Sequence, residues 1–499
     1  MAEPSSFDVV IVGAGNAALT AALSAHEHGA RVAVLEKAPR EWRGGNTRFT
    51  GGVFRFAYKG IDDVADVVPE VKEQQAAGAD PGYYSEAQFY EDLMNVTEGK
   101  ADPKLTELLV RESCDTVNWM ARYGVRFRMA GLQYPVGRAK VGERQTEAPT
   151  GSLVRARGEG PELSESLFRI VGEQEIPVFY DTMMLDLAFT ETGTVNGVII
   201  RDSNDQTRTL RAGNVILACG GFESSPEMRS RYLGPLWDNC KVRGTRFDTG
   251  EGLNIALRAG ARAFGQWSGC HATPIDVQAP QYGNLEIWDK TNRLSYPYSV
   301  MVDREGHRFV DEGEDFAGFT YAKYGRAILE RPGSVAYQIF DAKCEGLLEP
   351  RYSTGTPVVA QTIEDLAHRL GIDPETLSHT IAEFNDAVID VEFSRHLLDG
   401  KATRGLLPRK SNWAQQIDTP PYTCYPVTCG ITFTFGGIEI NEQSQVLDGR
   451  GRVMPGLYAA GEITGGFFYH NYPVGSGLMR GAVTGRIAGA HAALEGKRR

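Results

Sequence analysis

The segment from Phe7 to Glu36 constrains the fold of this chain more than any other part of the sequence. Its apolar run Val9–Val12 is typical of a strand that is covered on both faces. The turn Gly13-Ala14-Gly15-Asn16-Ala17-Ala18 follows and leads into a helix, and a second strand ends at Glu36. A strand, a glycine turn, a helix and a second strand in this order form the dinucleotide-binding unit of α/β folds.

The turn residues have separate physical roles in binding a pyrophosphate. Gly13 permits the turn, Gly15 lets the pyrophosphate approach the backbone N–H groups, and Ala18 allows the helix to pack on the strand. Glu36 stands where a carboxylate accepts hydrogen bonds from ribose hydroxyls, and it disfavours a 2′-phosphate. The segment therefore predicts FAD or NAD(H) without choosing between them. The residues expected at the cofactor here are Gly13, Gly15, Asn16, Ala17, Ala18, Glu36 and Lys37.

The length and charge of the chain limit its organisation and its partners. A chain of 499 residues is too long for one ordinary core and predicts two or three domains. The net charge of -12 argues against a nucleic-acid partner, because phosphate binding needs clustered Lys and Arg. An anionic substrate would therefore need a local basic pocket.

Cysteine usage and hydropathy predict a cytoplasmic protein. The seven cysteines show no paired C-x-x-C spacing, which is typical of a reducing compartment. Cys424 and Cys429 have no second ligand pair, so we expect buried apolar groups and no metal site. No signal peptide precedes the first strand, and no apolar run approaches the roughly 18 residues of a membrane helix. We expect at most a peripheral association with membranes.

Glycine-rich segments recur along the chain. Gly44–Gly52 contains four glycines in nine residues, which predicts a loop whose backbone lies against a ligand. Gly213–Phe222 is an apolar strand that runs into Gly220-Gly221, without a second dinucleotide fingerprint. The last helix, from about Ser476 to Leu494, carries glycines at strict four-residue spacing: Gly477, Gly481, Gly485 and Gly489. Each interior glycine costs about 1 kcal/mol relative to alanine, so the stripe predicts close packing on another helix or on the cofactor.

The segment from about Gly269 to Cys424 differs in composition from the segments on either side of it. Short strands, aromatic residues and prolines replace the dense glycine motifs, which predicts an inserted second domain. Its marker is Val300–Glu312, a hairpin in pattern with the turn at Glu305-Gly306. The glycine-rich texture returns at Phe435 and continues into the last helix.

Seven motifs together resemble those of the fumarate reductase and succinate dehydrogenase flavoprotein superfamily, which includes the 3-ketosteroid dehydrogenases and urocanate reductase. They are GAGNAA, Glu36, GGNTRFTGG, VILACGGF, TGEG, DREGHRFVDE and GLYAAGEITGG, and they span essentially the whole chain. GGNTRFTGGVFRFAYKG and RFVDEGEDFAGFTYAKYGR are most similar to the FAD-dependent tricarballylate dehydrogenases. The resemblance implies FAD and an α/β fold, with a Rossmann-like FAD-binding domain (residues 1–270 and 425–499) and an inserted α+β capping domain (residues 271–424).

The resemblance also implies where FAD is bound. Gly13, Gly15 and Ala18 would hold the pyrophosphate, and Glu36 the adenosine ribose. The isoalloxazine side would meet Asn46, Thr47 and Gly52, the ribityl chain Gly461 and Glu462, and the pyrimidine edge Ser476, Gly477 and Leu478. Further residues expected at the cofactor are Gly45, Gly51, Gly220 and Gly221. Succinate dehydrogenases attach FAD through a histidine that aligns near Asn46, and asparagine cannot make that bond, so we expect non-covalent FAD.

Three departures from the fumarate reductase pattern bear on the substrate. The arginine proton donor of those enzymes corresponds to Phe316, a substrate histidine to Phe433, and a substrate arginine to Tyr472. Without its acid and its carboxylate clamps, this chain is not expected to be a fumarate reductase in the narrow sense. The N-Y-P-x-G pattern around Tyr472 resembles the ketosteroid dehydrogenases, in which the tyrosine polarises a substrate oxygen. We expect Tyr472 to contact a carboxylate or to help activate the α-proton.

Oxidation of a CH–CH bond beside a carboxylate needs a base, a cationic clamp and an electron acceptor. The candidate clamps are Arg155, Arg293 and Arg480, with His271 and His470 near them in the motifs. Solvated charges explain Arg155 and Arg293 as readily, and a hydrogen-bonded structural histidine explains His271. Candidate proton carriers besides Tyr472 are Tyr298, Tyr321, Tyr324 and Asp315.

The leading hypothesis is an FAD-dependent dehydrogenase of a small polycarboxylate, by resemblance one that converts tricarballylate to cis-aconitate. A second hypothesis is a 3-ketosteroid-type or other enone-forming dehydrogenase with a larger apolar substrate. A third, of another class, is a flavin electron-transfer or redox-sensing subunit without substrate chemistry. Only one dinucleotide fingerprint is present, so we expect electrons to leave to an acceptor protein or a quinone-linked carrier.

Overall fold

The computed structural model describes residues 6–76, 82–130, 140–141, 144–145 and 153–496. Its largest sheet has eight strands in the order β20-β21-β11-β1-β2-β8, with β10 paired to β11 and β9 paired to β10. These strands are β1 (Ser6–Val12), β2 (Val32–Leu35), β8 (Val178–Phe179), β9 (Met183–Phe189), β10 (Val195–Arg201), β11 (Thr207–Leu217), β20 (Gln445–Leu447) and β21 (Val453–Ala459).

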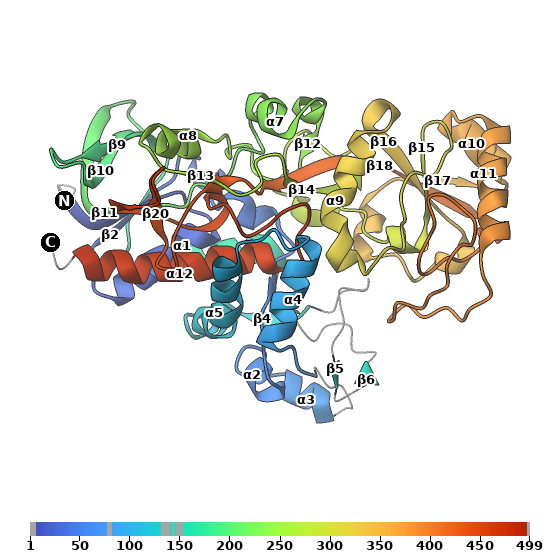
Figure 1. Cartoon of the computed structure of the whole chain (residues 1–499), viewed down its shortest axis with the longest axis horizontal. Helices are drawn as coiled ribbons and strands as arrows, with labels where there is room; N and C mark the ends of the chain where they lie inside the picture. Colours follow the sequence, from blue (N-terminus) through green and yellow to red (C-terminus); the bar gives the residue numbers. More distant parts are fainter. Residues whose placement is uncertain (1–5, 77–81, 131–139, 142–143, 146–152, 497–499) are drawn as a thin grey trace.

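The centre of this sheet is parallel, from β21 through β11, β1 and β2 to β8. Val9, Val10 and Ile11 of β1 are fully buried, as expected for a strand covered on both faces. The helix α1 (Asn16–Glu27) follows β1, and α12 (Ser476–Gly496) from the end of the chain lies beside it (Figure 1). The predicted strand, turn, helix and strand from Phe7 to Glu36 are present, and the predicted α/β fold is confirmed.

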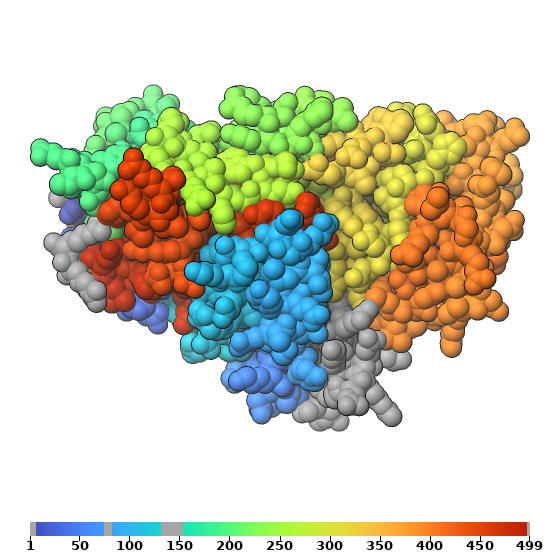
Figure 2. Space-filling view, viewed as in Figure 1, coloured from blue at the N-terminus to red at the C-terminus, as the bar shows by residue number. Residues whose placement is uncertain are grey.

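A second sheet of six strands occupies the other end of the molecule. Its order is β12-β18-β16-β15, and β14 and β17 also pair with β18. Its strands are β12 (Lys241–Val242), β14 (Cys270–Asp276), β15 (Val300–Asp303), β16 (Val335–Phe340), β17 (Val358–Ala360) and β18 (Tyr422–Thr434). The helix α9 (Ala317–Leu329) packs on β14 and β18, and α10 (Ile363–Leu370) and α11 (Pro374–Ala387) cover the outer end. The segments from α9 through α11 form most of the yellow and orange block of the space-filling view (Figure 2).

Two strands run across the predicted domain boundaries. β14 begins at Cys270, and β18 continues without a break through residues 424 and 425. The division into residues 1–270, 271–424 and 425–499 therefore stays a prediction.

The predicted hairpin at Val300–Glu312 is wrong in its second arm. β15 pairs with β16, and only an isolated bridge joins Val302 to Arg308. The carboxylate of Glu312 accepts a hydrogen bond from the backbone N–H of Met301 at 2.8 Å and pairs with Arg308. A side chain thus occupies the backbone donor that a hairpin partner would have used.

The remaining elements complete the two ends of the molecule. Around the first sheet lie β3 (Val53–Arg55), β4 (Phe127–Met129), β7 (Leu153–Ala156), α2 (Ile61–Ala65), α3 (Val71–Ala76), α4 (Glu86–Val96), α5 (Pro103–Arg122), α6 (Glu159–Glu173), α7 (Pro226–Leu233) and α8 (Glu251–Arg258). Two short strand pairs are β5 (Lys140–Val141) with β6 (Arg144–Gln145), and β13 (Ala263–Phe264) with β19 (Gly437–Ile438). Within the described ranges, no helix is both long enough and apolar enough to cross a bilayer.

The glycine stripe of α12 faces α1. A Cβ atom at Gly485 would lie 2.3 Å from the carbonyl oxygen of Ala17, and one at Gly489 would lie 2.2 Å from that of Ala21. The two helix backbones therefore touch where any side chain would separate them. Of the two predicted partners of the stripe, another helix or the cofactor, the structure shows the helix at Gly485 and Gly489. Gly477 differs, because a Cβ there would lie 3.5 Å from the ring of Phe433, an ordinary contact.

We expect Gly485→Ala and Gly489→Ala to lower the free energy of unfolding by about 1–3 kcal/mol each, because the added methyl group meets backbone that cannot move aside. Gly172→Ala is the matched control, since Gly172 lies exposed in α6 with nothing near its Cβ position. It should be neutral or stabilise by about 0.5–1 kcal/mol through helix propensity. Chemical denaturation followed by circular dichroism measures all three, and equal stabilities for the three variants would contradict the packing argument.

Candidate active site

A deep cleft opens where the parallel strands of the first sheet end. It encloses about 1640 Å³ of space between protein atoms, the part open to solvent included. The turns after β1, β2 and β11 line one side, and residues of the second sheet region line the other. Ligands of open α/β sheets bind at this position, outside the carboxyl ends of the strands.

The fingerprint turn approaches the cleft with its backbone. Gly13 has a φ of +104°, and a Cβ there would lie 2.3 Å from the carbonyl oxygen of Ala218, so the turn itself requires glycine. Gly15 is different, because the protein atoms nearest to its Cβ position are 3.5 and 3.7 Å away. Packing alone does not exclude a side chain at Gly15. The space in front of it belongs to the cleft.

Asn16 joins the fingerprint turn to two distant segments. Its backbone N–H donates to Thr47 Oγ1 at 2.8 Å, and its Nδ2 donates to the carbonyl oxygen of Leu478 at 2.8 Å. Its Oδ1 is buried and has no hydrogen-bond partner among the described residues. The glycine-rich loop and the start of α12 are thus fixed against the turn, and one acceptor atom remains for a ligand.

Glu36 ends β2 at the edge of the cleft, with 7% of its surface exposed. Its Oε1 accepts a hydrogen bond from the backbone N–H of Ala38 at 2.8 Å. Burial raises the pKa of Glu36 to about 7, more than the hydrogen bonds and the nearby Lys37 lower it. Lys37 itself donates to Thr249 Oγ1 at 2.6 Å and to Glu251 at 2.7 Å. A buried carboxylate of this kind suits hydroxyl donors such as those of a ribose.

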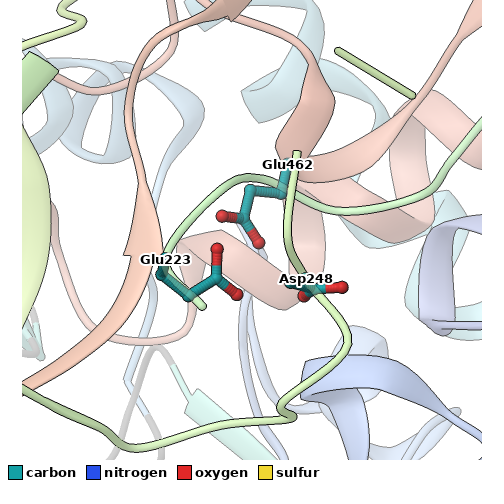
Figure 3. A group of neighbouring side chains, drawn as sticks. All are labelled: Glu223, Asp248 and Glu462. Carbon is teal, nitrogen blue, oxygen red and sulfur yellow. The ribbon is translucent and has the colours of Figure 1, made fainter. Parts of the chain in front are cut away.

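Three carboxylates meet deeper in the cleft (Figure 3). Oxygens of Glu223, Asp248 and Glu462 lie within 4.8 Å of one another, and Asp248 and Glu462 line the cleft. Burial raises the pKa of Glu223 well above its ordinary value and that of Asp248 to about 8. Glu223 Oε2 has no hydrogen-bond partner among the described residues. The cluster therefore offers acceptors to a ligand that carries hydroxyl groups, and the expected absence of a metal site stays a prediction.

Asn46 holds this cluster in place with its side chain. Its Nδ2 donates to Glu223 Oε1 at 2.5 Å and to the carbonyl oxygen of Thr432 at 2.8 Å. Its Oδ1 accepts from the backbone N–H of Thr245 at 2.9 Å. An amide in this position has no nucleophilic atom, which supports the prediction of non-covalent FAD.

A pair of tyrosines forms an aromatic wall of the cleft. The hydroxyls of Tyr321, on α9, and Tyr472 are hydrogen-bonded to each other, and both residues line the cleft. His271, on β14, lies behind them with its ring 4.9 and 4.8 Å from theirs, and it stacks on Phe433 at 5.0 Å. Burial lowers the pKa of His271 well below its ordinary value, so its imidazole is neutral. Neither ring nitrogen has a hydrogen-bond partner in the described part of the chain.

Basic side chains from three segments line the cleft near the second sheet. Arg351 Nη1 lies 2.5 Å from Asp289 Oδ2, and Arg243 pairs with the other oxygen of the same carboxylate. Arg155 Nη1 lies 2.9 Å from Glu159, and its Nε has no partner among the described residues. The sequence predicted Arg155 as a clamp and missed the other three residues. Of these three residues, only Arg243 could have been suspected from the sequence, because it lies six positions before the TGEG motif that the sequence analysis assigned to the superfamily.

Arg480 lines the cleft from α12 with 3% of its surface exposed. Its guanidinium lies over the rings of Phe433, Phe467 and Phe468. This position agrees with the prediction of a cation beside the start of the last helix, although the structure does not test its role.

His271, which lies behind the aromatic wall, and the proton-carrier candidates Tyr324 and Asp315 do not line the cleft that the described residues form. Three further predicted catalytic residues lie outside it as well. Tyr298 is buried in a cluster with Phe316. Arg293 pairs with Asp276 at 2.7 Å and donates to three backbone carbonyl groups, so it holds loops together. His470 is partly exposed and lies 3.3 Å from Gln266 Nε2. We therefore do not carry these three residues into the proposed mechanism.

Most residues predicted at the cofactor line the cleft. They are Gly13, Gly15, Asn16, Ala17, Glu36, Lys37, Gly45, Asn46, Thr47, Gly51, Gly220, Gly461, Glu462, Gly477 and Leu478. Those that lie behind its wall are Ala18, Gly52, Gly221 and Ser476. Gly52 is constrained by the protein, because a Cβ there would lie 2.9 Å from the backbone of Glu159.

Comparison with known proteins identifies the family. A sequence model described as FAD binding domain matches residues 8–478. The chain belongs to this FAD-binding family. It is 29% identical over 503 residues to fumarate reductase (cytochrome) of Shewanella frigidimarina, a match that covers all of this chain and 79% of that protein. It is 26% identical over 576 residues to 3-oxosteroid 1-dehydrogenase of Mycobacterium tuberculosis, with 99% of both chains covered.

A solved structure gives the same result. The open conformation of a flavocytochrome c3 fumarate reductase matches with a TM-score of 0.71 and 26% identity, over 99% of this chain and 79% of that one. The resemblance to the superfamily, the FAD cofactor and the enzyme class, an FAD-dependent oxidoreductase acting on CH–CH groups, are confirmed. None of these three relatives is named for tricarballylate.

The residues of the cleft fit FAD. The space before Gly15 suits the approach of a pyrophosphate to the backbone. The unpartnered Oδ1 of Asn16 and the buried carboxylate of Glu36 are acceptors that suit hydroxyl donors such as those of a ribose. The carboxylates of Asp248 and Glu462, which line the cleft, suit further hydroxyl groups.

We expect the affinity of the apoprotein for FAD to increase about tenfold from about pH 6 to about pH 8, because ribose hydroxyls favour the ionised form of Glu36 and its pKa is near 7. Isothermal titration calorimetry at several pH values measures the affinity and the proton released on binding. Glu36→Gln should bind FAD more weakly and lose most of this pH dependence. A Glu36→Gln protein with the wild-type pH dependence would show that another group is responsible.

Proposed function

We propose that this protein is an FAD-dependent dehydrogenase that oxidises a CH–CH bond beside a carboxylate in a small polycarboxylate, with tricarballylate converted to cis-aconitate. One observation carries the proposal. Arginines from three separate segments line the cleft beside the Tyr321–Tyr472 pair. FAD, when bound, supplies the acceptor for the two electrons that leave the substrate.

The charges that line the cleft are divided between its two ends. Acidic residues dominate around the fingerprint and the carboxylate cluster, where hydroxyl groups of FAD are expected. Near the second sheet, Arg155, Arg243 and Arg351 line the cleft, each paired with an acid. Asp289 pairs with both Arg243 and Arg351, Glu349 pairs with Arg351 as well, and Glu159 pairs with Arg155. Gly51 lies between the two halves of this group, since its Cβ position is 3.1 Å from Asp289 and 3.9 Å from Arg155.

Guanidinium groups select carboxylates through paired, charge-assisted hydrogen bonds. Asp289 occupies part of the donor set of Arg243 and Arg351 and fixes the two groups side by side. Asn292 Nδ2 donates to the same carboxylate at 2.8 Å, so the arrangement is rigid. Several fixed guanidiniums in one pocket favour a substrate with more than one carboxylate. They would also stabilise the negative charge that develops on a carboxylate when the adjacent C–H bond loses its proton.

The tyrosine pair provides the route for that proton. The pair can take up the proton when one of its two hydroxyls is ionised: Tyr472 as a phenolate accepts the proton at its oxygen, and the hydrogen bond from Tyr321 stabilises that phenolate before the transfer. Tyr472 is the member that we place against the substrate, and Tyr321 connects it to the body of α9. Phe433 and the neutral His271 pack behind the pair and exclude water from it.

A second candidate is an enone-forming dehydrogenase with a larger apolar substrate. It is favoured by the aromatic wall of Tyr321, Phe433 and Tyr472, in which Phe433 stands where the sequence comparison expected the substrate histidine of fumarate reductases. The arginines favour the polycarboxylate instead, because a guanidinium that lines a cleft, such as Arg155 with its unpartnered Nε among the described residues, can donate to a carboxylate and a steroid offers none. A flavin subunit without substrate chemistry would use neither the arginines nor the tyrosines.

Electrons would then leave to an acceptor protein or a quinone-linked carrier. The sequence holds one dinucleotide fingerprint, and the described part of the chain shows one unit of strand, glycine turn and helix of this kind, at β1 and α1. We therefore expect NADH alone to reduce the bound FAD slowly or not at all.

The test is to mix the oxidised holoprotein anaerobically with a panel of tricarballylate, succinate, a 3-ketosteroid and NADH, and to follow the flavin absorbance band. Tricarballylate should bleach the band. Bleaching by the steroid and not by tricarballylate would select the second candidate, and no bleaching by any organic substrate would select the electron-transfer subunit. Rapid bleaching by NADH would contradict the expectation that the bound FAD exchanges electrons with an acceptor protein or a quinone-linked carrier and not with a nicotinamide.

Two variants locate the chemistry in the cleft. Arg155→Met should raise the KM for tricarballylate about tenfold or more, because it removes a charged hydrogen bond to a carboxylate. Arg169→Met is its matched control. Like Arg155, Arg169 pairs with the glutamate four positions later, here Glu173 on α6, but its side chain is 52% exposed. Tyr472→Phe should lower kcat about a hundredfold and leave the FAD spectrum unchanged. Wild-type kinetics in both cleft variants would contradict the proposed site.

A further inference from the structure

Arg480 is a buried cation that forms no ion pair among the described residues. It is 3% exposed, and its Nε and Nη1 are buried without hydrogen-bond acceptors among the described residues. Arginine is rarely buried unless it is paired, because an uncompensated charge in the interior costs several kcal/mol. The sequence folds a guanidinium into the cleft at this cost, which points to a ligand as its partner.

Aromatic rings hold the guanidinium of Arg480 in place. Its Cζ lies 4.9 Å from the ring centre of Phe468 and 5.4 Å from that of Phe433, within the range of cation–π attraction. Burial lowers the pKa of Arg480 to about 10, against the nearby Glu462 and Tyr472, which raise it. The guanidinium therefore stays charged at neutral pH and is held by aromatic rings that offer it no anion.

The neighbours of Arg480 on α12 place it at the cofactor end of the cleft. Two positions earlier, the carbonyl oxygen of Leu478 accepts a hydrogen bond from Asn16 of the fingerprint turn. One position later, Gly481 faces the same Asn16, with its Cβ position 3.0 Å from Nδ2. The arginines that we assign to substrate gather instead around Asp289. Arg480 thus belongs to the segment that packs on the fingerprint.

We propose that Arg480 sets the redox potential of the bound FAD. Two-electron reduction adds negative charge to the pyrimidine side of a flavin, and a fixed cation there favours the reduced form. The helix start at Ser476 adds a positive dipole end to the same region. Arg480 shifts the potential only because it interacts more strongly with the reduced cofactor than with the oxidised one. This inference rests on FAD binding and not on the identity of the substrate.

The test measures the midpoint potential of FAD in the holoprotein without substrate, by equilibration with a reference dye. Arg480→Met should shift the equilibrium toward the oxidised form tenfold to a hundredfold, which for a two-electron couple is about 30–60 mV more negative. Arg480→Lys keeps the charge and should remain closer to the wild type than Arg480→Met. The affinity of the oxidised protein for FAD should change less than the potential. If Arg480→Met does not retain FAD, Arg480→Gln replaces it, with the same expected shift.

Arg486→Met is the matched control. Arg486 lies on the same helix and also stacks on an aromatic ring, at 5.5 Å from that of Trp119, but it does not line the cleft. Its removal should leave the potential unchanged. A wild-type potential in the neutral Arg480 variants, or an equal shift in Arg486→Met, would overturn the proposal. An unchanged potential with a raised KM for substrate would also overturn it, and would assign Arg480 to the substrate.

Discussion

The contact between α1 and α12 is the interaction on which the cleft depends. The two helices come from opposite ends of the chain, and the glycines of α12 let their backbones touch at Ala17 and Ala21. This contact brings the start of α12 against the fingerprint turn, where Asn16 binds the carbonyl oxygen of Leu478. Tyr472 and Arg480 lie on either side of that point in the sequence. A wider helix spacing would move both side chains away from the cofactor end of the cleft.

The electrostatics of the cleft explain how an acidic protein can take an anionic substrate. The chain carries a net charge of -12, yet most of the cationic side chains that line its cleft lie near Asp289 or at Arg480. The carboxylates of the opposite end are buried, and burial raises the pKa values of Glu36, Glu223 and Asp248. Hydroxyl donors of a bound ligand favour the ionised form of such a carboxylate, in which both oxygens accept hydrogen bonds. The two ends can therefore bind ligands of different chemistry within one cavity.

The sequence predicted the features that are local in the chain. The unit from Phe7 to Glu36 is confirmed, because its strand, turn and helix are specified by consecutive residues. The glycine stripe predicted a close contact but left its partner open, since spacing alone does not say whether a helix or a cofactor faces it. The hairpin at Val300–Glu312 is wrong only in its second arm, because Glu312 takes a backbone donor that the second strand needed.

The basic pocket could not be predicted, because its members are isolated charges in unrelated loops. Arg243, Asp289 and Arg351 are more than forty positions apart in sequence, and only the fold brings them together. Arg293 illustrates the opposite error, since it lies four positions from Asp289 but is used to hold backbone carbonyl groups. Motif spacing locates a segment near a site, whereas long-range packing decides which of its side chains face the ligand.

The most direct test of the two-ended cleft is a crystal structure of the protein with both FAD and tricarballylate bound. The account predicts the adenosine ribose at Glu36, the flavin beside Arg480, carboxylates of the ligand on Arg155, Arg243 or Arg351, and its CH–CH bond facing Tyr472. Carboxylates that contact none of these arginines, or a flavin remote from Arg480, would contradict it.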